Sequence, residues 1–370
     1  MPALDGVRGI AILLVVMHNL NFLQGPRGPI AHLAVSWFDR GWIGVQLFFV
    51  LSGFLISGIL LDSRHAPNYY QSFFGRRVLR IFPLYYTTVL LMLVILPALH
   101  IWHGFSVSAH PAQLGVLVFL SNWIEPFFVG EGSFPHFWSL AVEEQFYLLW
   151  PFIVYRCDPK QLLKLCGAIV AVAPVIRWGL LTAGYSDEVV YAFTVCRMDA
   201  LAIGAASAAV LRIPAWRDWV TNNVSRLSWT GAGILLFGAA VSHVYNETLP
   251  MAQIFGYSFL ALAFGIFVLV AASADISGAP GWPKWLRGAA LGRVGLYSYG
   301  MYVLHIPIRD IVGLPLLNAW GLDDHSSLAI DLSFILIGTL ISFALAAASY
   351  HFFEIHFLRL KRYFVPASIR

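Results

Sequence analysis

Charged side chains are scarce in this 370-residue chain, where Asp, Glu, Lys and Arg together make up 11% of the residues. A soluble protein carries roughly 25% charged residues, which keep its surface in contact with water. Here 59% of the residues are hydrophobic, and the mean hydropathy is +0.74. The composition therefore excludes an ordinary water-soluble fold and predicts a protein embedded in a membrane.

Cysteine is also scarce, and Cys157, Cys166 and Cys196 form neither a metal-ligand spacing nor an even disulfide set. The net charge of +4 lies in short clusters between apolar runs rather than on one polar face. We therefore expect no nucleic-acid partner and no metal site. Since no stretch resembles a soluble domain or a repeat, we predict one transmembrane domain over residues 1–360 and a short basic tail, 361–370.

Apolar runs of about 20 residues, the length that a helix needs to cross the hydrocarbon core, recur along the chain. They predict an all-α membrane protein, a bundle of about ten transmembrane helices. The predicted spans are 5–23, 42–61, 79–98, 137–155, 165–183, 198–211, 228–244, 253–273, 290–313 and 328–351. A further apolar stretch, 112–124, rises only about 20 Å as a helix.

Positive charges alternate between successive loops, provided that 112–124 does not cross the membrane. Arg76, Arg77, Arg80 and Arg156 then lie on one side, and no Lys or Arg occurs between the last two. The positive-inside rule places this side, with both termini, in the cytoplasm. We therefore expect 112–124 to be a re-entrant or interfacial segment.

A long segment, 99–136, then lies on the outer side and carries many imidazole, indole and carboxyl groups. They include His100, Trp102, His103, His110, Trp123, Glu125 and Glu131. One interpretation is an aromatic cap at the membrane surface. The other is a lid over an acceptor site that faces outward.

Ionisable groups inside membrane helices cost a few kcal/mol each and are therefore candidates for function. The first predicted span holds Arg8, His18 and Asn19. A helix places His18 about 15 Å along the axis from Arg8, so Arg8 lies near the cytoplasmic side and His18 near the outer side. Histidine titrates near neutral pH and suits a general base. A histidine at the membrane interface is the structural alternative.

Three arginines, Arg76, Arg77 and Arg80, lie at the start of the third predicted span. Arg77 and Arg80 are three residues apart and share one face of a helix. Guanidinium groups bind phosphate in a bidentate manner, so a cytoplasmic ligand that carries phosphate, such as coenzyme A, fits the cluster. The structural alternative is anchoring to acidic lipids.

Two carboxylates, Glu143 and Glu144, occur in an apolar helix that also carries His136 and Ser139. Ser139 and Glu143 are one turn apart and can face the same cavity. A buried carboxylate can hold a histidine tautomer, pair with an arginine or carry a proton. The alternative is a purely structural ion pair.

Later spans contain further ionisable residues. Arg177 and Arg309 indicate interhelical pairs that select the arrangement of the bundle. Arg197 and Asp199 open the short span predicted in the middle of the chain. His305 lies in an otherwise apolar run and is another candidate base.

Seven stretches of the sequence together resemble the acyltransferase-3 family of integral membrane acyltransferases. They run in family order from residue 4 to about 360, and they read LDGVRGIAILLVV, GVQLFFVLSGFLISGILL, FFGRRVLRIFPLYY, HFWSLAVEEQFYLLWP, RMDALAIGA, YSYGMYVLHIPI and SYHFFE. Each stretch alone is weak evidence, whereas their combination is specific.

The resemblance implies a core of about ten helices that moves an acyl group, often acetyl, from cytoplasmic acyl-CoA to a sugar hydroxyl. The implied acceptor is an envelope polysaccharide, lipopolysaccharide or peptidoglycan, or for some members a macrolide. Acyl-CoA is then a co-substrate, and no cofactor is bound permanently. The resemblance also implies a bacterial inner membrane and the stand-alone type, without the external hydrolase-like domain of some relatives.

The first span departs from the family pattern, in which ten residues separate an arginine from a histidine. Here nine residues separate Arg8 from His18, and Asn19 holds the usual position of the histidine. The base is then His18 offset by one position, or it is His136 or His305, or catalysis has been lost.

The resulting hypothesis is O-acyl transfer through the bilayer. The arginine cluster binds the phosphates of acyl-CoA, and the pantetheine arm passes Arg8. His18 takes the proton of the acceptor hydroxyl, helped by Glu143 or Glu144. An acyl-enzyme on Ser139 or on a histidine is an alternative route. A transporter or flippase and a catalytically inactive relative are alternative functions.

Overall fold

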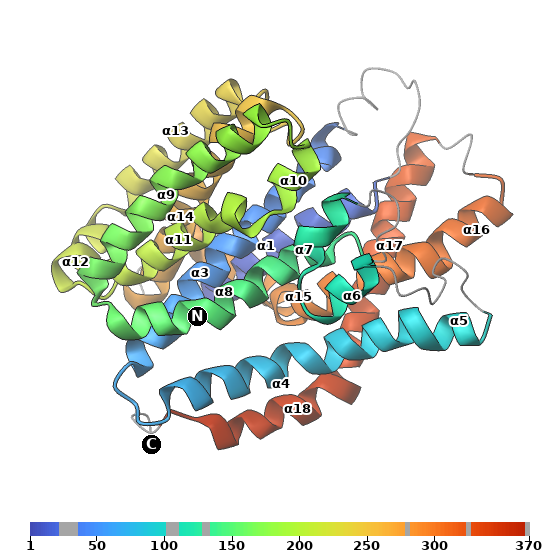
Figure 1. Ribbon diagram of the computed structural model, residues 1–370, viewed down its shortest axis with the longest axis horizontal. Coiled ribbons are helices and arrows are strands. Elements are labelled where there is room, and N and C mark those ends of the chain that lie inside the picture. Colours follow the sequence, from blue (N-terminus) through green and yellow to red (C-terminus); the bar gives the residue numbers. More distant parts are fainter. Residues whose placement is uncertain (22–35, 101–110, 128–133, 278–281, 323–326, 367–370) are drawn as a thin grey trace.

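The computed structural model describes residues 1–21, 36–100, 111–127, 134–277, 282–322 and 327–366. Within these ranges the chain is a bundle of helices without strands (Figure 1). Its long helices are α1 (Pro2–Asn19), α3 (Ile43–Ser63), α4 (Tyr69–Leu90), α8 (Phe137–Arg156), α9 (Pro159–Thr182), α11 (Thr194–Val210), α13 (Val224–Val241), α14 (Tyr257–Ser277), α15 (Ala289–Ile308) and α17 (Leu328–Ser349).

Short helical segments connect or extend these helices. They are η1 (Arg40–Trp42), η2 (Leu91–Ile95), α5 (Leu96–Ala98), α6 (Pro111–Leu117), α7 (Ser121–Ile124), η3 (Glu125–Phe127), α10 (Asp187–Ala192), α12 (Pro214–Asn222), η4 (Ala252–Gly256), η5 (Trp282–Arg287), η6 (Arg309–Gly313), α16 (Leu314–Ala319), η7 (Tyr350–Glu354), α18 (Ile355–Arg359) and η8 (Leu360–Phe364).

Eight helical stretches in the described part of the chain are long and apolar enough to cross a membrane. They are Ser36–Ser63, Tyr69–Ala98, Pro159–Thr182, Asp187–Val210, Val224–Val241, Ala252–Ile276, Ala289–Ala319 and Leu328–Phe364. The predicted all-α membrane fold is confirmed. The predicted count of ten is not, because α1 and α8 are outside these eight.

Two helices begin earlier than the sequence predicted. The predicted span 198–211 is the end of a longer stretch, α10 and α11, so Arg197 and Asp199 lie one turn inside α11 rather than at its start. Similarly, α4 begins at Tyr69, so the arginine cluster lies within the helix that crosses, not at its start. Both helices begin with polar residues. A prediction from hydropathy places the start of a span at its first apolar residue, and it therefore missed the first turns of both helices.

The segment 112–124 forms no crossing helix, as predicted. Its described part consists of α6, of seven residues, and α7, of four. Phe119 between them has a φ of +56°, a left-handed conformation that ends α6. Of the rest of the predicted external segment, 101–110 and 128–133, with His103, His110 and Glu131, lie outside the described residues.

Four helices, α1, α3, α11 and α15, pack so closely that their backbones touch. A side chain at Gly295 of α15 would collide with the Asp5 backbone of α1. Between α3 and α11, the same holds for Gly53 against Leu201 and for Gly204 against Val50. Small residues allow such approach, which drives helix association in membranes by close packing rather than by hydrophobicity.

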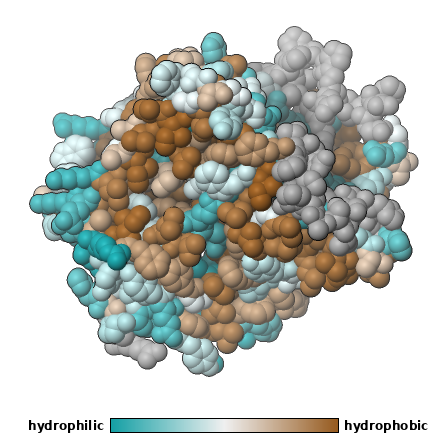
Figure 2. All heavy atoms as spheres, in the orientation of Figure 1, coloured by the Kyte–Doolittle hydropathy of each residue, from teal (hydrophilic) through white to brown (hydrophobic). Residues whose placement is uncertain are grey.

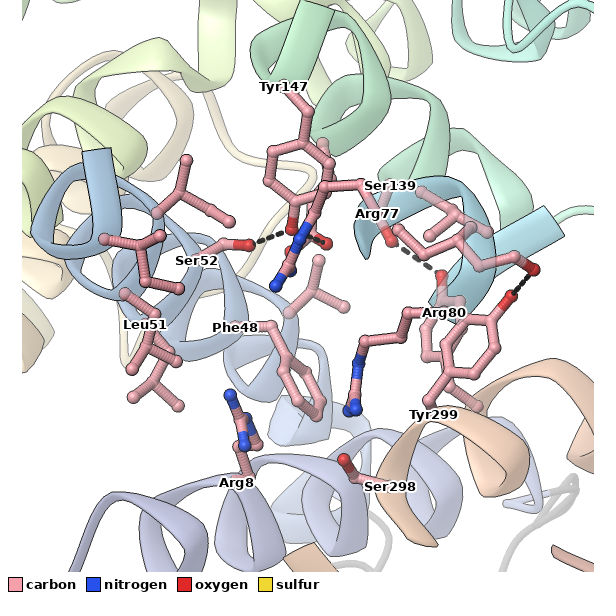
Figure 3. A pocket seen from close by; sticks show the side chains of 18 residues that line it. Arg8, Phe48, Leu51, Ser52, Arg77, Arg80, Ser139, Tyr147, Ser298 and Tyr299 are labelled. Carbon is pink, nitrogen blue, oxygen red and sulfur yellow. Dashed lines mark hydrogen bonds between the residues drawn. The ribbon is translucent and has the colours of Figure 1, made fainter. Parts of the chain in front are cut away.

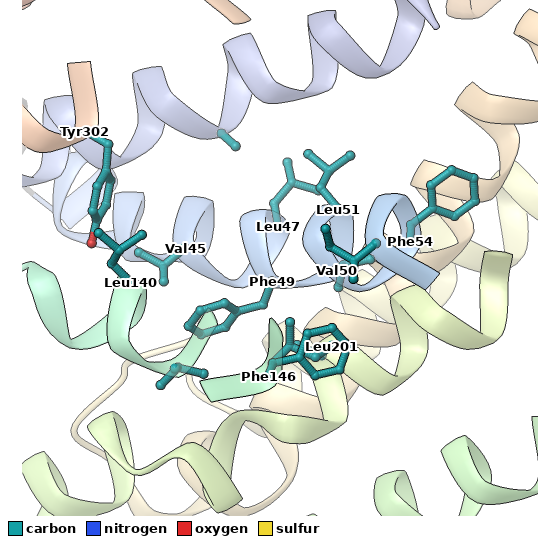
Figure 4. Close-up of a cluster of buried hydrophobic side chains, with 14 of the residues drawn as sticks. Val45, Leu47, Phe49, Val50, Leu51, Phe54, Leu140, Phe146, Leu201 and Tyr302 are labelled. Carbon is teal, nitrogen blue, oxygen red and sulfur yellow. The ribbon is translucent and has the colours of Figure 1, made fainter. Parts of the chain in front are cut away.

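Apolar side chains of α3 fill the centre of the bundle, between α8 and α11 (Figure 4). Phe49 and Val50 are fully buried, as is Leu201 of α11. The periphery is different, because α9, α13 and α17 expose large apolar side chains such as Trp178 and Leu236. Hydrophobic residues spread over the face shown in Figure 2, as expected for contact with lipid.

Candidate active site

Five helices, α1, α3, α4, α8 and α15, enclose a cavity of about 170 Å³ (Figure 3). Its polar lining comes from all five helices: Arg8, Ser52, Arg77, Arg80, Ser139, Glu143, Tyr147, Ser298, Tyr299 and Tyr302. The apolar lining is mostly from α3, including Phe48 and Leu51. Residues far apart in the sequence are therefore brought together as one polar chamber inside an apolar bundle.

The cavity carries an excess of positive charge. Arg8, Arg77 and Arg80 line it with a single carboxylate, Glu143. Arg8 pairs with Asp5 at 3.0 Å, whereas the Nε of Arg77 is buried without a hydrogen-bond partner. In Figure 3 the three guanidinium groups point into the space between the helices. An unpartnered buried guanidinium is costly, and an anionic ligand would satisfy it.

A chain of hydroxyl groups leads to the carboxylate. The Tyr147 hydroxyl donates to Glu143 Oε2 at 2.8 Å. Because a phenol has one proton, the Ser52 hydroxyl is the donor in its short bond to Tyr147. Arg77 lies 6.0 Å from the centre of the Tyr147 ring. The hydrogen-bond partner of Glu143 is thus Tyr147, whereas the sequence left open a histidine, an arginine or a proton as what this carboxylate holds.

A second chain of hydroxyl groups fixes the proton of Ser139. The Tyr302 hydroxyl donates to the backbone oxygen of His136, and it lies 2.6 Å from Ser139 Oγ. Since Tyr302 has no second proton, Ser139 is the donor in that pair. The Ser139 proton therefore points at a phenol that is already committed, and no base takes it. This arrangement argues against Ser139 as a nucleophile.

Three candidate histidines form a group beyond Tyr302. The rings of His136 and His305 are 5.0 Å apart, and His305 interacts electrostatically with His18. None of the described histidines lines the cavity itself. Tyr302 joins the two regions, because its hydroxyl lines the cavity and bonds the backbone of His136.

The surroundings of each imidazole determine what it can do. Nδ1 of His305 lies 2.7 Å from the Tyr302 carbonyl, so Nδ1 carries the proton of the neutral ring and Nε2 keeps its lone pair. Nε2 is buried without a partner. His18 is half-buried and has Nδ1 3.3 Å from the Phe38 carbonyl. Its Nε2 is likewise the basic nitrogen, and of the three imidazoles His18 is the most accessible.

Besides the three histidines, two further predicted site residues lie off the cavity. Arg76 does not line it, although it neighbours Arg77 in the sequence. Glu144 also faces elsewhere, and its Oε1 is buried without a hydrogen-bond partner. The physical reason is helical geometry, because successive residues point about 100° apart and only one of each adjacent pair faces the chamber.

The segment that contains α7 is tied to α8 by an amide network. Gln145 donates to Asn122 at 2.8 Å and to the Phe119 carbonyl, and it accepts from Trp123 and Thr194. These contacts position α7 and η3 against α8 and α11.

At the end of the same segment, Glu125 has a buried oxygen without a partner. Burial raises the pKa of Glu125 to about 7. Its carboxyl is thus poised to gain or lose a proton near neutral pH.

Arg177 forms the interhelical pair that the sequence predicted. It is fully buried and bonds Asp199 of α11 at 2.9 Å and Ser258 of α14 at 2.7 Å. Arg309 instead pairs with its neighbour Asp310 and donates to the Asn19 carbonyl at 3.2 Å, which ties α15 to the end of α1.

Sequence reasoning missed five hydroxyl residues of the site, Ser52, Tyr147, Ser298, Tyr299 and Tyr302. Two of them carried a usable signal. Tyr147 lies four residues after Glu143, and Tyr302 lies three residues before His305, so each shares a helix face with a residue already singled out. Ser52 had no such signal, because its partner is on another helix.

Comparisons with known proteins agree with this architecture. The family model described as an acyltransferase domain matches residues 1–351. The chain is 30% identical over 339 residues to the peptidoglycan O-acetyltransferase OatA of Listeria monocytogenes, covering 83% of this chain and 49% of that protein. It is 24% identical to the O-acetyltransferase OatA of Staphylococcus aureus, covering 96% and 56%. No solved structure matches.

The chain spans about half the length of these curated relatives. The match to the family model nevertheless extends over nearly all of the chain, including every helix that lines the cavity. This chain therefore belongs to the acyltransferase-3 family of membrane proteins.

Proposed function

We propose that this protein is an O-acetyltransferase that moves an acetyl group from cytoplasmic acyl-CoA to a hydroxyl of a cell-wall glycan on the other side of the membrane. One observation carries the proposal. A cavity with three arginines and one carboxylate lies next to a group of three histidines, and Tyr302 joins the two. The acetyl group follows from the similarity to both O-acetyltransferases, and the glycan follows from the similarity to the peptidoglycan O-acetyltransferase of Listeria monocytogenes.

The arginines suit the donor. Coenzyme A carries several phosphate charges, and guanidinium groups are the side chains that bind phosphate best. Arg77 and Arg80 face the cavity from α4, whereas Arg8 faces it from α1. We assign Arg77 and Arg80 to the donor's phosphates and Arg8 to the arm that carries the thioester. We do not assign Arg76 to the donor's phosphates, because it does not line the cavity.

The histidines suit the acceptor. In the proposed step the acceptor oxygen attacks the thioester carbon, a C–O bond forms and the C–S bond breaks. His18 takes the hydroxyl proton at Nε2 and returns it to the leaving thiolate, so that an ester and coenzyme A result. We favour direct transfer, because the proton of Ser139 is committed to Tyr302.

Transfer in reconstituted vesicles tests the proposal. Purified protein in proteoliposomes receives acetyl-CoA, labelled in the acetyl group, on one side and a peptidoglycan-derived oligosaccharide on the other. Label joined to the oligosaccharide by an alkali-sensitive ester supports an acetyltransferase. Label that crosses without joining the acceptor would identify a transporter instead. His18→Ala protein that folds normally and keeps full activity would refute the role of His18.

A further inference from the structure

Arg197 of α11 is a fully buried cation that the mechanism above does not use. Four aromatic rings surround its guanidinium carbon, Tyr257 at 4.0 Å, Tyr191 at 4.6 Å, Trp138 at 5.2 Å and Trp42 at 5.7 Å. Ring faces attract a cation and hold it without any negative charge. We call this group of Arg197 and four rings the arginine cage.

The guanidinium of the arginine cage is only partly satisfied by hydrogen bonds. Nη1 makes a long contact of 3.4 Å to Gln46 Oε1, and the Tyr191 hydroxyl forms a side-chain hydrogen bond with the guanidinium group. Nε and Nη2 are buried and have no hydrogen-bond partner. These two nitrogens form one edge of the guanidinium, the edge that grips a carboxylate with two parallel bonds.

The nearby carboxylate of Asp199 is already committed. It accepts from Arg177 at 2.9 Å, from Ser258 at 2.6 Å and from the backbone of Ala200. The two buried arginines of this region therefore share one buried aspartate, which leaves one positive charge uncompensated. Buried charges in proteins are normally paired, so an unpaired one at a ready-made carboxylate fork marks a site for an anion.

The arginine cage lies at the same end of the bundle as the histidines. Trp138 and His136 are on the first turn and the cap of α8, while Trp42 precedes α3 and Arg197 is in the first turn of α11. Trp138 is a wall of the cage, and the next residue, Ser139, lines the central cavity. A ligand in the cage would thus be held beside the place where the acceptor hydroxyl reacts.

A turn with unusual backbone geometry forms the roof of the arginine cage. His243, Val244 and Tyr245 have consecutive positive φ angles of 48°, 60° and 54°, a strained conformation for residues other than glycine. The Trp42 indole donates to the Tyr245 carbonyl at 3.2 Å, so the strained turn contacts a cage wall. Glu247, two residues further on, has a buried oxygen without a partner and is attracted electrostatically by Arg40 and, more weakly, by Arg197.

We propose that the arginine cage binds a carboxylate of the glycan acceptor, with Nε and Nη2 of Arg197 as the two donors. This inference rests on the proposed function for the nature of the acceptor. In the absence of acceptor, Glu247 is the nearby carboxylate that offsets the charge from the roof. The acceptor's carboxylate replaces it when the strained turn opens.

Isothermal titration of the purified full chain in detergent tests the site, with N-acetylmuramic acid as the probe. Its methyl ester is the matched control, since it has the same sugar and no charge. We expect the acid to bind at least about tenfold more tightly than the ester, because the ester cannot form the charge-assisted bidentate contact with Arg197. Equal affinities, or no binding of the acid, would overturn the proposal.

Two variants test which residues determine the affinity for the acid. Arg197→Met should weaken binding of the acid at least about tenfold while folding is kept, because no buried carboxylate depends on Arg197 alone. Glu247→Gln should tighten it, because a competing carboxylate is removed. An unchanged affinity in Arg197→Met would contradict the proposal. Weaker binding in Glu247→Gln would contradict the exchange of carboxylates.

Transfer to an uncharged acceptor separates this inference from the proposed function. Acetylation of an N-acetylglucosamine oligomer, measured with the same preparations, does not need the carboxylate. Transfer without binding of the acid would contradict the proposed carboxylate site in the arginine cage and leave the proposed function standing. Binding of the acid without any transfer would defeat the proposed function and leave a carboxylate-binding site.

Discussion

Replacing Ser139 by alanine tests the reaction route most directly. Ser139 is 6% exposed, and its hydroxyl donates to Tyr302, whose own proton bonds the His136 carbonyl. In Ser139→Ala the Tyr302 hydroxyl loses one donor but keeps its acceptor, so no buried N–H or O–H is left unpaired. The loss is one neutral hydrogen bond, worth about 0.5–1.5 kcal/mol.

That energy limits the loss of rate. A barrier change of about 1.4 kcal/mol is tenfold, so Ser139→Ala should keep at least about a tenth of the transfer activity. A nucleophilic serine would behave differently, with a loss on the order of 10⁶, as measured in a serine protease. The assay is the initial rate of acetyl transfer in proteoliposomes that contain equal amounts of folded protein.

Tyr302→Phe is the matched control for this experiment. It removes both the donor to His136 and the acceptor of the Ser139 proton, and each orphaned buried group costs about 1–3 kcal/mol. We therefore expect a lower unfolding temperature and a larger loss of activity than in Ser139→Ala. A loss of several orders of magnitude in folded Ser139→Ala, with trapped acetyl-serine in the wild type, would refute direct transfer.

Three further predictions follow from other contacts. Arg77→Met should raise KM for acetyl-CoA about tenfold and Arg76→Met should leave it unchanged, because Arg77 lines the cavity and Arg76 does not. Equal effects of the two substitutions on KM would contradict the proposed donor site. Arg177→Met should cost about 3–5 kcal/mol of stability in denaturant titrations, because Asp199 is left charged and unpaired in the core, and Asp199→Asn in the same chain should restore part of it. Since burial raises the pKa of Glu125 from 4.5 to about 7, the folded state holds this proton to higher pH than the unfolded chain; stability should fall as the pH rises from about 4.5 to about 7, and Glu125→Gln should flatten that part of the melting-temperature profile.

The sequence was sufficient for the class of fold and for much of the cavity. Arg8, Arg77 and Arg80 stood out because guanidinium groups are costly in an apolar helix, and the same cost makes them gather around a polar chamber. Helical spacing correctly predicted that Ser139 and Glu143 face one cavity. Arg177 was correctly predicted to form an interhelical pair, since a buried charge needs a partner.

Contacts between helices could not be predicted from the sequence. The sequence did not predict the partner of Glu143, which is Tyr147 in its own helix. Arg197 and Asp199 are two residues apart, and residues at that spacing point to different sides of a helix. Asp199 therefore bonds Arg177 on α9, and Arg197 faces aromatic rings that come from four separate segments.

The backbone contacts at Gly295, Gly53 and Gly204 have a mechanical consequence for how substrates enter. Where helices touch main chain to main chain, no side chains lie between them that could rearrange. The helices α1, α3, α11 and α15 are therefore held rigidly against one another. An opening that admits a donor or an acceptor must then involve movement of segments that pack less closely. Those segments are α4 with its arginines, the turn above the arginine cage and the outer helices in contact with lipid.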